Sequence, residues 1–585
     1  MQPSRRGLAG LLASAATTIA TRAPAARLEG RANLRDFAAA GDGRADETAA
    51  LLAAAASGLE LDIAAGRYRV SRDVTFRAPV NFAYGAVLQS ADDITLAFDG
   101  GLAAGLQQIF VLTGRARVTI DRRFLQTGRP EWWGAVTDDP AFDCQPAIQA
   151  CIDACPVTAL QAADYHTRSA IRIAIHNRVL EGVGSNQNGA PGGSRIVLGS
   201  ATADGLRVGF DQPPPNGVPG FLEHVTVRGL TIIRSVPPQA RPVTDPGQGF
   251  FTSPAGVRIQ YVVTCTFQDI NAIQHSNGFY LQGVVHSFLI FCQALRTAVG
   301  PSRDNDFFNG FFQLNALDIG YASGNASLYY KNCSAFIDNG LDLAKSSGIY
   351  TYGGFTDTFI NAFECAFLEV GLNMNGAGST AASYSSEDLV IDSCILDTCS
   401  IGGIVINAGN DGTAVTIHNC YVEVRGSGVA MDVKQTAGSV SIVGCQIQSA
   451  PGDAATGISV RDAGGVVSDA NIVTDVRRPI AYDNARDCRC GDTINNVRDG
   501  APDGALVIAR SSRCVFRPIV KGRTGVTRAG VVFAGAANTL NEIDCTGIDS
   551  TCLQGGAASK LVCDGVQVTA PGPFGDKNLA VGIFA

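Results

Sequence analysis

The sequence predicts an all-β chain wound as a parallel solenoid, and two repeated patterns in its central half support this prediction. Short apolar runs such as "LYYKNCSA" and "VTIHNCYV" recur about every 30 residues, with Cys or an apolar residue at the sixth position. A fixed period of this length is typical of repeat architectures. We place the following residues in one buried column: Leu230, Cys265, Cys292, Cys333, Cys365, Cys394, Cys420, Cys445 and Ile472.

The second pattern is a glycine followed by alternating apolar residues, as in "GFYLQ" and "GIVIN". Period-two runs are typical of β-strands and argue against helical repeats. One unit cannot bury its own apolar face, so successive units must stack at about 4.8 Å per coil. The glycines that define this pattern are Gly278, Gly310, Gly340, Gly371, Gly403, Gly428 and Gly457.

A sharp bend is predicted just before the sixth position of each run. The residue there is often Asn or Gly, which tolerate a left-handed backbone. The cysteines are then small buried hydrophobes, because no C-x-x-C motif or His partner suggests metal binding or catalysis. The coil spacing would also permit some disulfides. The residues predicted at the bend are Gly229, Asn332, Asn419, Gly444 and Asn471.

Composition excludes some classes of protein. The chain has 585 residues, of which 67 are Gly and only 17% are charged, and its formal net charge is −8. This balance, without a Lys/Arg cluster, argues against nucleic-acid binding. No apolar run reaches membrane-spanning length. Residues 1–26 carry paired arginines, Arg5 and Arg6, which suggest either a twin-arginine export signal or an N-terminal anchoring arm.

Two stretches near the N-terminus share the same predicted order of turn, helix and strand. "DFAAAGDGRADET" and "PEWWGAVTDDPAFD" each lead through an Asp turn into an Ala-rich helix and then a strand with a Tyr. Asp46 and Asp143 are expected to accept hydrogen bonds from the free backbone N–H groups at the helix starts. In the second helix Cys144, Cys151 and Cys155 form one apolar face, suited to covering the open end of a solenoid.

These two motifs resemble the opening motifs of pectate-lyase-like right-handed β-helix proteins, a superfamily that includes phage tailspikes and secreted polysaccharide depolymerases. The resemblance implies a right-handed parallel β-helix with short capping helices at the N-terminal end. We expect Trp132 and Trp133 to pack at the junction between two modules. The expected divisions are 1–26 as signal or arm, 27–128 as a head module, 129–487 as the main helix and 488–585 as irregular distal coils.

The resemblance also implies a polysaccharide ligand, held along a groove on a stacked sheet. Amides, carboxylates and an Arg in stacked register suit hydroxyl-rich sugars. An exposed strand face is also polar for ordinary reasons of solvation. The expected binding residues are Tyr280, Gln282, Arg303, Tyr352, Asn373, Asn375 and Asn407.

Two cleavage chemistries remain open. Hydrolysis needs two carboxyl groups, and we expect these from Asp342 with Asp304 or Asp306 on a neighbouring coil. Elimination at a uronic acid needs a base, for which Lys345 or Tyr350 in a loop beside the sheet is the candidate, with Arg303 as neutraliser. Each of these residues could also be an ordinary solvated turn residue.

We therefore expect an extracellular or cell-surface protein that binds a polysaccharide and cleaves it as a lyase or a glycoside hydrolase. The alternative is a non-catalytic glycan-binding spike or adhesin of a phage or phage-like particle. A homotrimer is expected, and the N-terminal segment would either direct export or join the protein to a virion tail or head. No residue pattern indicates a cofactor; a Ca²⁺ ion is left open.

Overall fold

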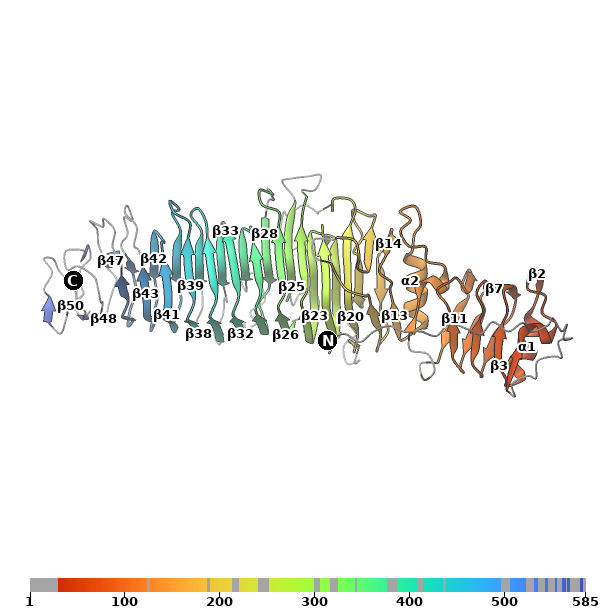
Figure 1. Ribbon diagram of the computed structural model, residues 1–585. Helices are drawn as coiled ribbons and strands as arrows, with labels where there is room; N and C mark the ends of the chain where they lie inside the picture. The colour runs from red at the N-terminus through yellow and green to blue at the C-terminus, as the bar shows by residue number, and fades with distance from the viewer. Residues whose placement is uncertain are drawn as a thin grey trace, which may run out of the picture.

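The protein is an elongated rod of parallel strands that runs from a small N-terminal module to the distal coils (Figure 1). The computed structural model describes residues 30–121, 123, 127–186, 190–212, 220–239, 252–298, 306–315, 325–341, 343, 345–375, 387–407, 414–434, 438–495 and 505–521, and beyond these only strands between 531 and 581. The fold is a right-handed parallel β-helix, as the sequence predicts.

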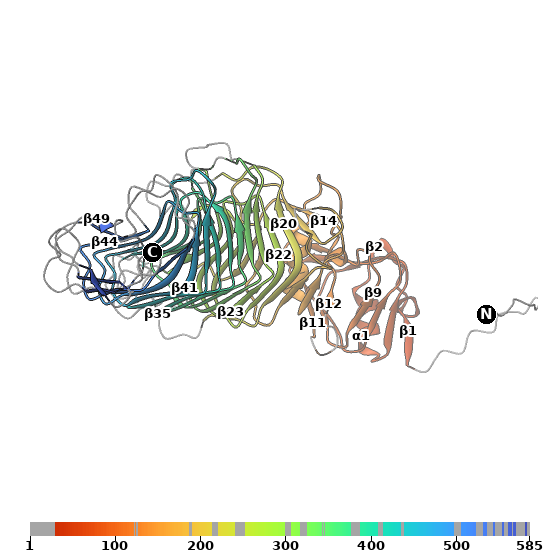
Figure 2. The same ribbon diagram turned by 60° about the vertical axis from the view of Figure 1, so that its left-hand side comes forward.

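The head module is a short β-helix with three sheets of its own (Figure 2). The helix η1 (Leu34–Phe37) and the helix α1 (Thr48–Ala56) lie near its first coil. Its strands are β1 (Arg31–Asn33), β3 (Glu60–Ile63), β6 (Val80–Phe82) and β9 (Leu102–Ala104); β2 (Asp42–Asp46), β4 (Gly66–Val70), β7 (Ala86–Asp92) and β10 (Phe110–Thr113); and β5 (Val74–Phe76), β8 (Thr95–Phe98) and β11 (Arg117–Ile120).

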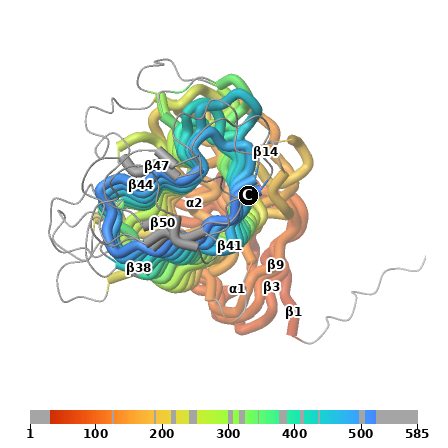
Figure 3. Tube along the Cα trace, turned by 90° about the vertical axis from the view of Figure 1, so that its left-hand side faces the viewer, coloured from red at the N-terminus to blue at the C-terminus, as the bar shows by residue number. Residues whose placement is uncertain are grey.

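The main helix has three faces, and each coil contributes one strand segment to each face in turn. Viewed along the axis, the coils superpose on one another (Figure 3). Face 1 contains β12 (Thr127–Gly128), β13 (Val157–Ala159), β16 (Val179–Glu181), the starts of β20 (Thr226–Arg234) and β22 (Thr266–Ile273), the end of β23 (Asn277–Ile290), β26 (Ala326–Lys331), β29 (Thr356–Asn361), β32 (Glu387–Asp392), β35 (Ala414–His418), β38 (Ser439–Val443), the starts of β41 (Val466–Thr474) and β43 (Arg489–Asn495), β45 (Val515–Phe516) and β48 (Glu542–Asp544).

Faces 2 and 3 complete each coil. Face 2 contains β14 (Asp164–Thr167), β17 (Arg195–Leu198), the ends of β20, β22, β41 and β43, β24 (Gln293–Arg296), β27 (Ser334–Ile337), β30 (Glu364–Ala366), β33 (Ile395–Cys399), β36 (Tyr421–Val424), β39 (Gln446–Ser449) and β46 (Ile519–Lys521). Face 3 contains β15 (Ile171–Ile173), β18 (Leu206–Gly209), β21 (Ala255–Val263), the start of β23, β25 (Phe307–Leu314), β28 (Lys345–Tyr352), β31 (Val370–Asn375), β34 (Gly402–Asn407), β37 (Val429–Lys434), β40 (Thr456–Arg461), β42 (Arg478–Asp483), β44 (Leu506–Ala509), β47 (Val531–Ala534) and β49 (Leu553–Gln554). The short β19 (Leu222–Glu223) pairs with β21, and β50 (Lys560–Cys563), β51 (Val566–Val568) and β52 (Leu579–Val581) end the chain's described strands.

A left-handed residue turns the chain at the corner between face 1 and face 2. The predicted residues Gly229, Asn332, Asn419 and Gly444 all have positive φ, so this prediction is confirmed for them. The fifth was wrong, since Ala470 and not Asn471 adopts the positive φ. One residue later in each coil comes a buried side chain, because the bend directs it inward.

The buried column at this corner exists, but three of its predicted members were misplaced. Cys365 lies two residues along the coil, and Phe363 occupies its place between Cys333 and Cys394. Cys265 lies at the preceding corner, in register with Val225 and Ser287. Ile472 is 40% exposed. The column in register is Leu230, Ile270, Cys292, Cys333, Phe363, Cys394, Cys420, Cys445 and Asn471.

The glycine repeat has a steric cause at the corner between face 2 and face 3. A Cβ atom on Gly310 would lie 2.4 Å from the Cβ of Ala335 and 2.6 Å from the carbonyl oxygen of Gly348. Gly278 and Gly403 are equally crowded by the strand facing them across the coil interior. At these three positions a residue without a side chain avoids the overlap.

Two glycines of the predicted pattern lie elsewhere. Gly340 lies in a turn with φ 84°, and Gly348 takes its place in the column. Ala430, not Gly428, occupies the corner between Gly403 and Gly457. These shifts change which residues face outward on face 3, as described below.

The junction between the modules is built by the second helical motif. The helix η2 (Pro130–Trp133) and the helix α2 (Gln145–Ala154) lie between the two sets of sheets. Trp132 is buried and packs against Trp133 with ring centroids 6.3 Å apart, as predicted for this pair. The Oε1 atom of Glu131 accepts hydrogen bonds from the Tyr165 hydroxyl and from Gln161, each at 2.6 Å.

The Asp residues before both helices act much as expected. The Oδ1 atom of Asp46 accepts a hydrogen bond from the Thr48 N–H at 3.0 Å, and that of Asp143 accepts one from the Gln145 N–H at 3.1 Å. Regular stacking continues past Asp487, since β43 pairs with β45 and β46. Among the helices in the described ranges, none has the length and apolar character needed to cross a membrane.

We expect Gly310→Ala to lower the free energy of unfolding by about 1–3 kcal/mol, the usual cost of overpacking a core. Gly199→Ala is the matched control, because the nearest atom to its added Cβ, at 3.7 Å, is in ordinary contact. Thermal unfolding of both variants measures the difference. Equal stability of the two would contradict the steric account of the glycine column.

Candidate functional site

Two rows of side chains point outward on face 3, where the sequence places the ligand. The first row in register is Arg258, Tyr280, Phe312, Tyr350, Asn373, Val405, Asp432 and Ser459. The second is Gln260, Gln282, Leu314, Tyr352, Asn407, Lys434 and Arg461, and the backbone of Asn375 lies in register between Tyr352 and Asn407. The predicted binding residues Tyr280, Gln282, Tyr352, Asn373 and Asn407 therefore lie on face 3. The backbone register places Asn375 on the same face, in the second row.

The N-terminal part of these rows is buried. Tyr280 is 2% exposed and Gln282 is 3% exposed. The guanidinium of Arg258 lies 4.1 Å from the centroid of the Tyr280 ring and forms an ion pair of 2.8 Å with Asp204. The Tyr280 hydroxyl donates to the Oε1 atom of Gln282 at 3.1 Å. These two predicted residues therefore stabilise the coil stack and do not offer an open surface.

Tyr350 and Tyr352 lie in β28 and not in a loop beside the sheet, so that expectation was wrong. The Tyr350 ring stacks on Phe312 with centroids 5.8 Å apart and is 8% exposed. Asn373 and Asn407, further along the helix, are partly exposed and fit the predicted polar rows better. Lys345 begins β28 and is exposed. Asp304, Arg303 and Asp342 lie outside the described residues.

Asp306 has a structural environment. It is 1% exposed, and its two carboxylate oxygens accept hydrogen bonds of 2.7 and 2.6 Å from Arg296, which is itself fully buried. Arg296 also donates to the carbonyl oxygen of His275 at 3.1 Å. Burial, followed by the nearby charge of Arg234, holds the pKa of His275 well below its usual value. This buried pair argues against the catalytic role predicted for Asp306.

A different pair of carboxylates faces outward on face 2. Asp397 in β33 and Glu423 in β36 lie on adjacent coils. Leu396 pairs with Val422 and Cys399 with Val424, so Asp397 and Thr398 together oppose Glu423 in a β-bulge. Bulges redirect side chains and are frequent beside active sites.

The surroundings of the two carboxylates differ. Burial, followed by the charge of Glu423, raises the pKa of Asp397 above its usual value. Glu423 accepts hydrogen bonds from the Tyr421 hydroxyl at 3.0 Å and from the Gln448 amide at 3.1 Å, and lies 3.5 Å from the Arg425 guanidinium. Two carboxyl groups in unlike environments are the usual arrangement for acid and base roles.

The sequence carries a signal for this pair outside the glycine-led runs. Asp397 and Glu423 each follow a column cysteine by three residues, in "CILD" and "CYVE". The next repeat has "CQIQ", which places Gln448 beside them. Alignment of the strands after each corner would have brought the two acids into register.

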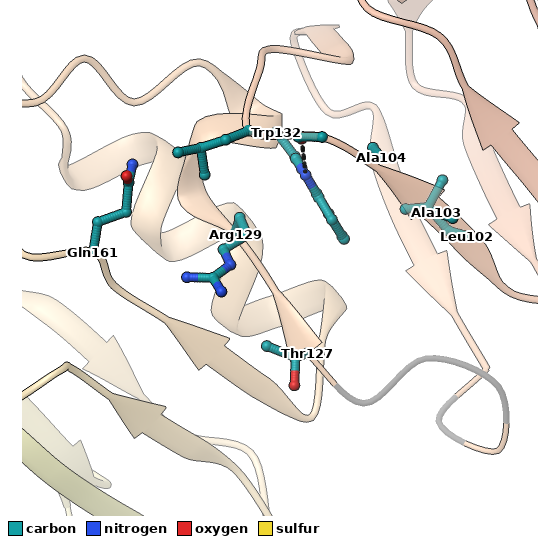
Figure 4. A pocket seen from close by; sticks show the side chains of 9 residues that line it. Leu102, Ala103, Ala104, Thr127, Arg129, Trp132 and Gln161 are labelled. Carbon is teal, nitrogen blue, oxygen red and sulfur yellow. Dashed lines mark hydrogen bonds between the residues drawn. The ribbon is translucent and has the colours of Figure 1, made fainter. Parts of the chain in front are cut away.

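A pocket of about 590 Å³ lies at the junction of the modules, close to Trp132 (Figure 4). The Trp132 indole N–H donates to the carbonyl oxygen of Gly105 at 3.0 Å, and Arg129 and Gln161 lie on the pocket's other side. The Trp132 ring is 4% exposed and belongs to the apolar core of the head module. Its role is therefore packing. In the described part of the chain, no group of three or more His, Cys, Asp or Glu side chains could hold a metal ion.

The fold places the chain in the structural class of right-handed parallel β-helices. Among solved structures, the chain is similar to a mutant of the tailspike protein of E. coli bacteriophage HK620 in complex with a pentasaccharide, at 12% identity over 70% of this chain and 73% of that one, with a TM-score of 0.51. A hexasaccharide complex of a mutant of the same tailspike has 12% identity over the same shares and a TM-score of 0.50. The PfbA surface adhesin of Streptococcus pneumoniae has 10% identity over 77% of this chain and all of that one, with a TM-score of 0.39. No family model and no curated protein matches the sequence.

We expect Asp306→Ala to lower the free energy of unfolding by about 3–5 kcal/mol, because it leaves the Arg296 charge buried without its partner. The measurement is thermal unfolding of the purified protein. Asp338→Ala is a control, since Asp338 is exposed at the end of β27. An Asp306→Ala variant as stable as the unaltered protein would contradict this structural role.

Proposed function

We propose that the protein binds a polysaccharide along the outer surface of face 2 and hydrolyses it with Asp397 and Glu423. The observation that carries the proposal is the pair of carboxylates on adjacent coils, where Asp397 and Thr398 oppose Glu423 in a β-bulge. The tailspike structures of the same fold are complexes with a pentasaccharide or a hexasaccharide, which supports a glycan as the ligand. A stacked sheet face also has the length and straightness that a linear polymer needs.

The different surroundings of Asp397 and Glu423 suggest a separate catalytic role for each carboxyl group. Burial and the charge of Glu423 raise the pKa of Asp397, which favours this residue as the donor of a proton to the glycosidic oxygen of the leaving group. Glu423, held by Tyr421 and Gln448, is then the nucleophile or the base. The strands of adjacent coils lie about 4.8 Å apart, a spacing close to the roughly 5–5.5 Å between carboxyl groups in retaining enzymes. We therefore propose a retaining mechanism, in which water attacks a glycosyl intermediate formed on Glu423.

Other parts of the site support polymer binding. Phe336, Ala366, Asp397, Glu423 and Gln448 follow one another in one outward row. Ala366 leaves space beside Asp397 on the N-terminal side, where a sugar ring can lie. Phe336 is partly exposed further along, and a partly exposed ring suits the apolar face of a pyranose.

The wider setting is also a proposal. We propose that the protein acts outside the producing cell, either on a virion as a spike or after export. A homotrimer and a role for the N-terminal segment in attachment to a virion tail or head accord with the spike version. Sedimentation of the full chain distinguishes a trimer from a monomer.

Replacing either carboxyl group should reduce cleavage by roughly 10²–10⁴-fold, the usual contribution of one acid or base. The variants are Asp397→Asn and Glu423→Gln, tested on a panel of purified bacterial surface and plant polysaccharides. New reducing ends measure hydrolysis, and absorbance near the ultraviolet edge measures the unsaturated product of a lyase.

The control is Asp392→Asn, which makes the same chemical change in the same coil but on face 1. It should cleave as the unaltered protein does. Cleavage that survives in both carboxyl variants would exclude this catalytic pair. Binding without cleavage across the panel would leave the glycan-binding spike or adhesin as the function.

The pH dependence tests the acid role. A proton donor must be protonated, so kcat/KM should fall as pH rises through the pKa of Asp397, which lies above its usual 3.8. Added salt should move this fall to lower pH, because it screens the Glu423 charge that helps to raise the pKa. Initial rates across pH at low and high ionic strength measure both effects, and a fall that salt does not move would argue against the pairing.

A further inference from the structure

A second pocket, of about 510 Å³, lies on the outer side of the corner between face 1 and face 2. Three successive coils form its floor, and the loop between β16 and β17 contributes to one wall. The residues that line it are Ser185, Gln268, Asp269, Asn271, Phe291, Gln293, Asn332 and Ser334.

Hydrogen bonds fix the wall of this corner pocket. The backbone N–H of Ser185 donates to the Oδ2 atom of Asp269 at 3.2 Å, and the Ser185 hydroxyl donates to the other carboxylate oxygen. The side-chain amide of Asn271 donates to the carbonyl oxygen of Asn186 at 2.7 Å. The wall is therefore part of the folded coil stack, and Asp269 and Asn271 are engaged in holding it.

Other lining groups remain available to a ligand. Among the described residues, the Oε1 atom of Gln293 is buried and has no hydrogen-bond partner. The side chains of Gln268, Asn332 and Ser334 likewise make no hydrogen bond within the described part of the chain. Buried polar atoms normally have partners, so an unpaired amide oxygen in a pocket indicates a group that a ligand or water satisfies.

The chemistry of the lining selects a class of ligand. Phe291 is 54% exposed, and the left-handed φ of 52° at this residue projects its ring from the corner. The available polar groups are amides and a hydroxyl, which donate and accept without charge. No Lys, Arg or His is among the lining residues, so the pocket does not suit a phosphate or another anion. Neutral polar groups beside an exposed ring suit a sugar.

The pocket is aligned with the carboxylate pair. Gln293 and Ser334 lie in the same outward row of face 2 as Ile395 and Tyr421, next to Asp397 and Glu423. From β27 to β33 there are two coil steps, or about 10 Å. A short oligosaccharide spans this distance.

We infer that the corner pocket is a recognition subsite for a neutral sugar residue of the polysaccharide, two to three coils from the bond that is cleaved. The inference rests on the proposed function, because it takes the bound polymer to run along face 2. Phe291 provides the surface against which the sugar ring stacks, and Gln293 provides the hydrogen bond that selects it.

The test uses Phe291→Ala and Gln293→Ala, each combined with Glu423→Gln so that the polymer stays intact. Native electrophoresis through gels containing the polysaccharides of the panel above measures binding as retardation. We expect both variants to bind the retarding polysaccharide roughly five- to ten-fold more weakly than Glu423→Gln alone. Phe288→Ala is the matched control, since Phe288 is 41% exposed nearby but points outward on face 1 and does not line the pocket.

The outcomes separate the two proposals. Weaker binding by both pocket variants, with the control unchanged, supports the subsite. Undiminished binding by both variants overturns the subsite and leaves the proposed function standing. Absence of retardation for the unaltered protein across the whole panel overturns the glycan-binding function, and the subsite with it. Far-ultraviolet circular dichroism and thermal unfolding establish that each variant is folded.

Discussion

The in-register stacking of coils is the constraint on which the rest of the structure depends. Each strand hydrogen-bonds to its equivalents one coil before and one coil after, so the same position recurs at about 4.8 Å along the rod. Apolar residues at such positions form continuous columns, and polar residues form continuous rows. A left-handed residue at the corner between face 1 and face 2 directs the next side chain inward, and this explains the φ values at Asn332, Asn419 and Gly444.

Much of the fold could be predicted because it depends on features that are local in sequence. The bend residue, the small buried residue after it and the crowded glycine each leave a mark with the period of the coil. The errors arose where one coil replaces the usual residue with another that also fits. Phe363 takes the structural position of a cysteine, and Ala430 takes that of a glycine. The residue type therefore changes in these coils, whereas the structural position is kept.

The site could be predicted less well, because outward residues carry no periodic signal of their own. An error of eight residues in the glycine register, from Gly348 to Gly340, gave Asp342 a place in the row that Tyr350 occupies. The sequence also did not indicate which polar residues are buried. Tyr280, Gln282 and Asp306 are polar, yet the folded protein buries all three. To predict Asp397 and Glu423, one must know which strand follows each corner. The bulge that brings Asp397 opposite Glu423 is not encoded in any short motif.

The buried thiols give the rod a particular vulnerability. The fourteen cysteines from Cys144 to Cys514 are buried and form no disulfide with one another. Burial raises the pKa of Cys144 and Cys265 to about 11, so these sulfurs are almost entirely protonated and inert at neutral pH. Unwinding of a few coils would release several thiols side by side, and air oxidation would then join them in pairs that no longer fit the stack. Damage by heat would therefore be irreversible, and the working lifetime of the protein would be set by how slowly its coils open.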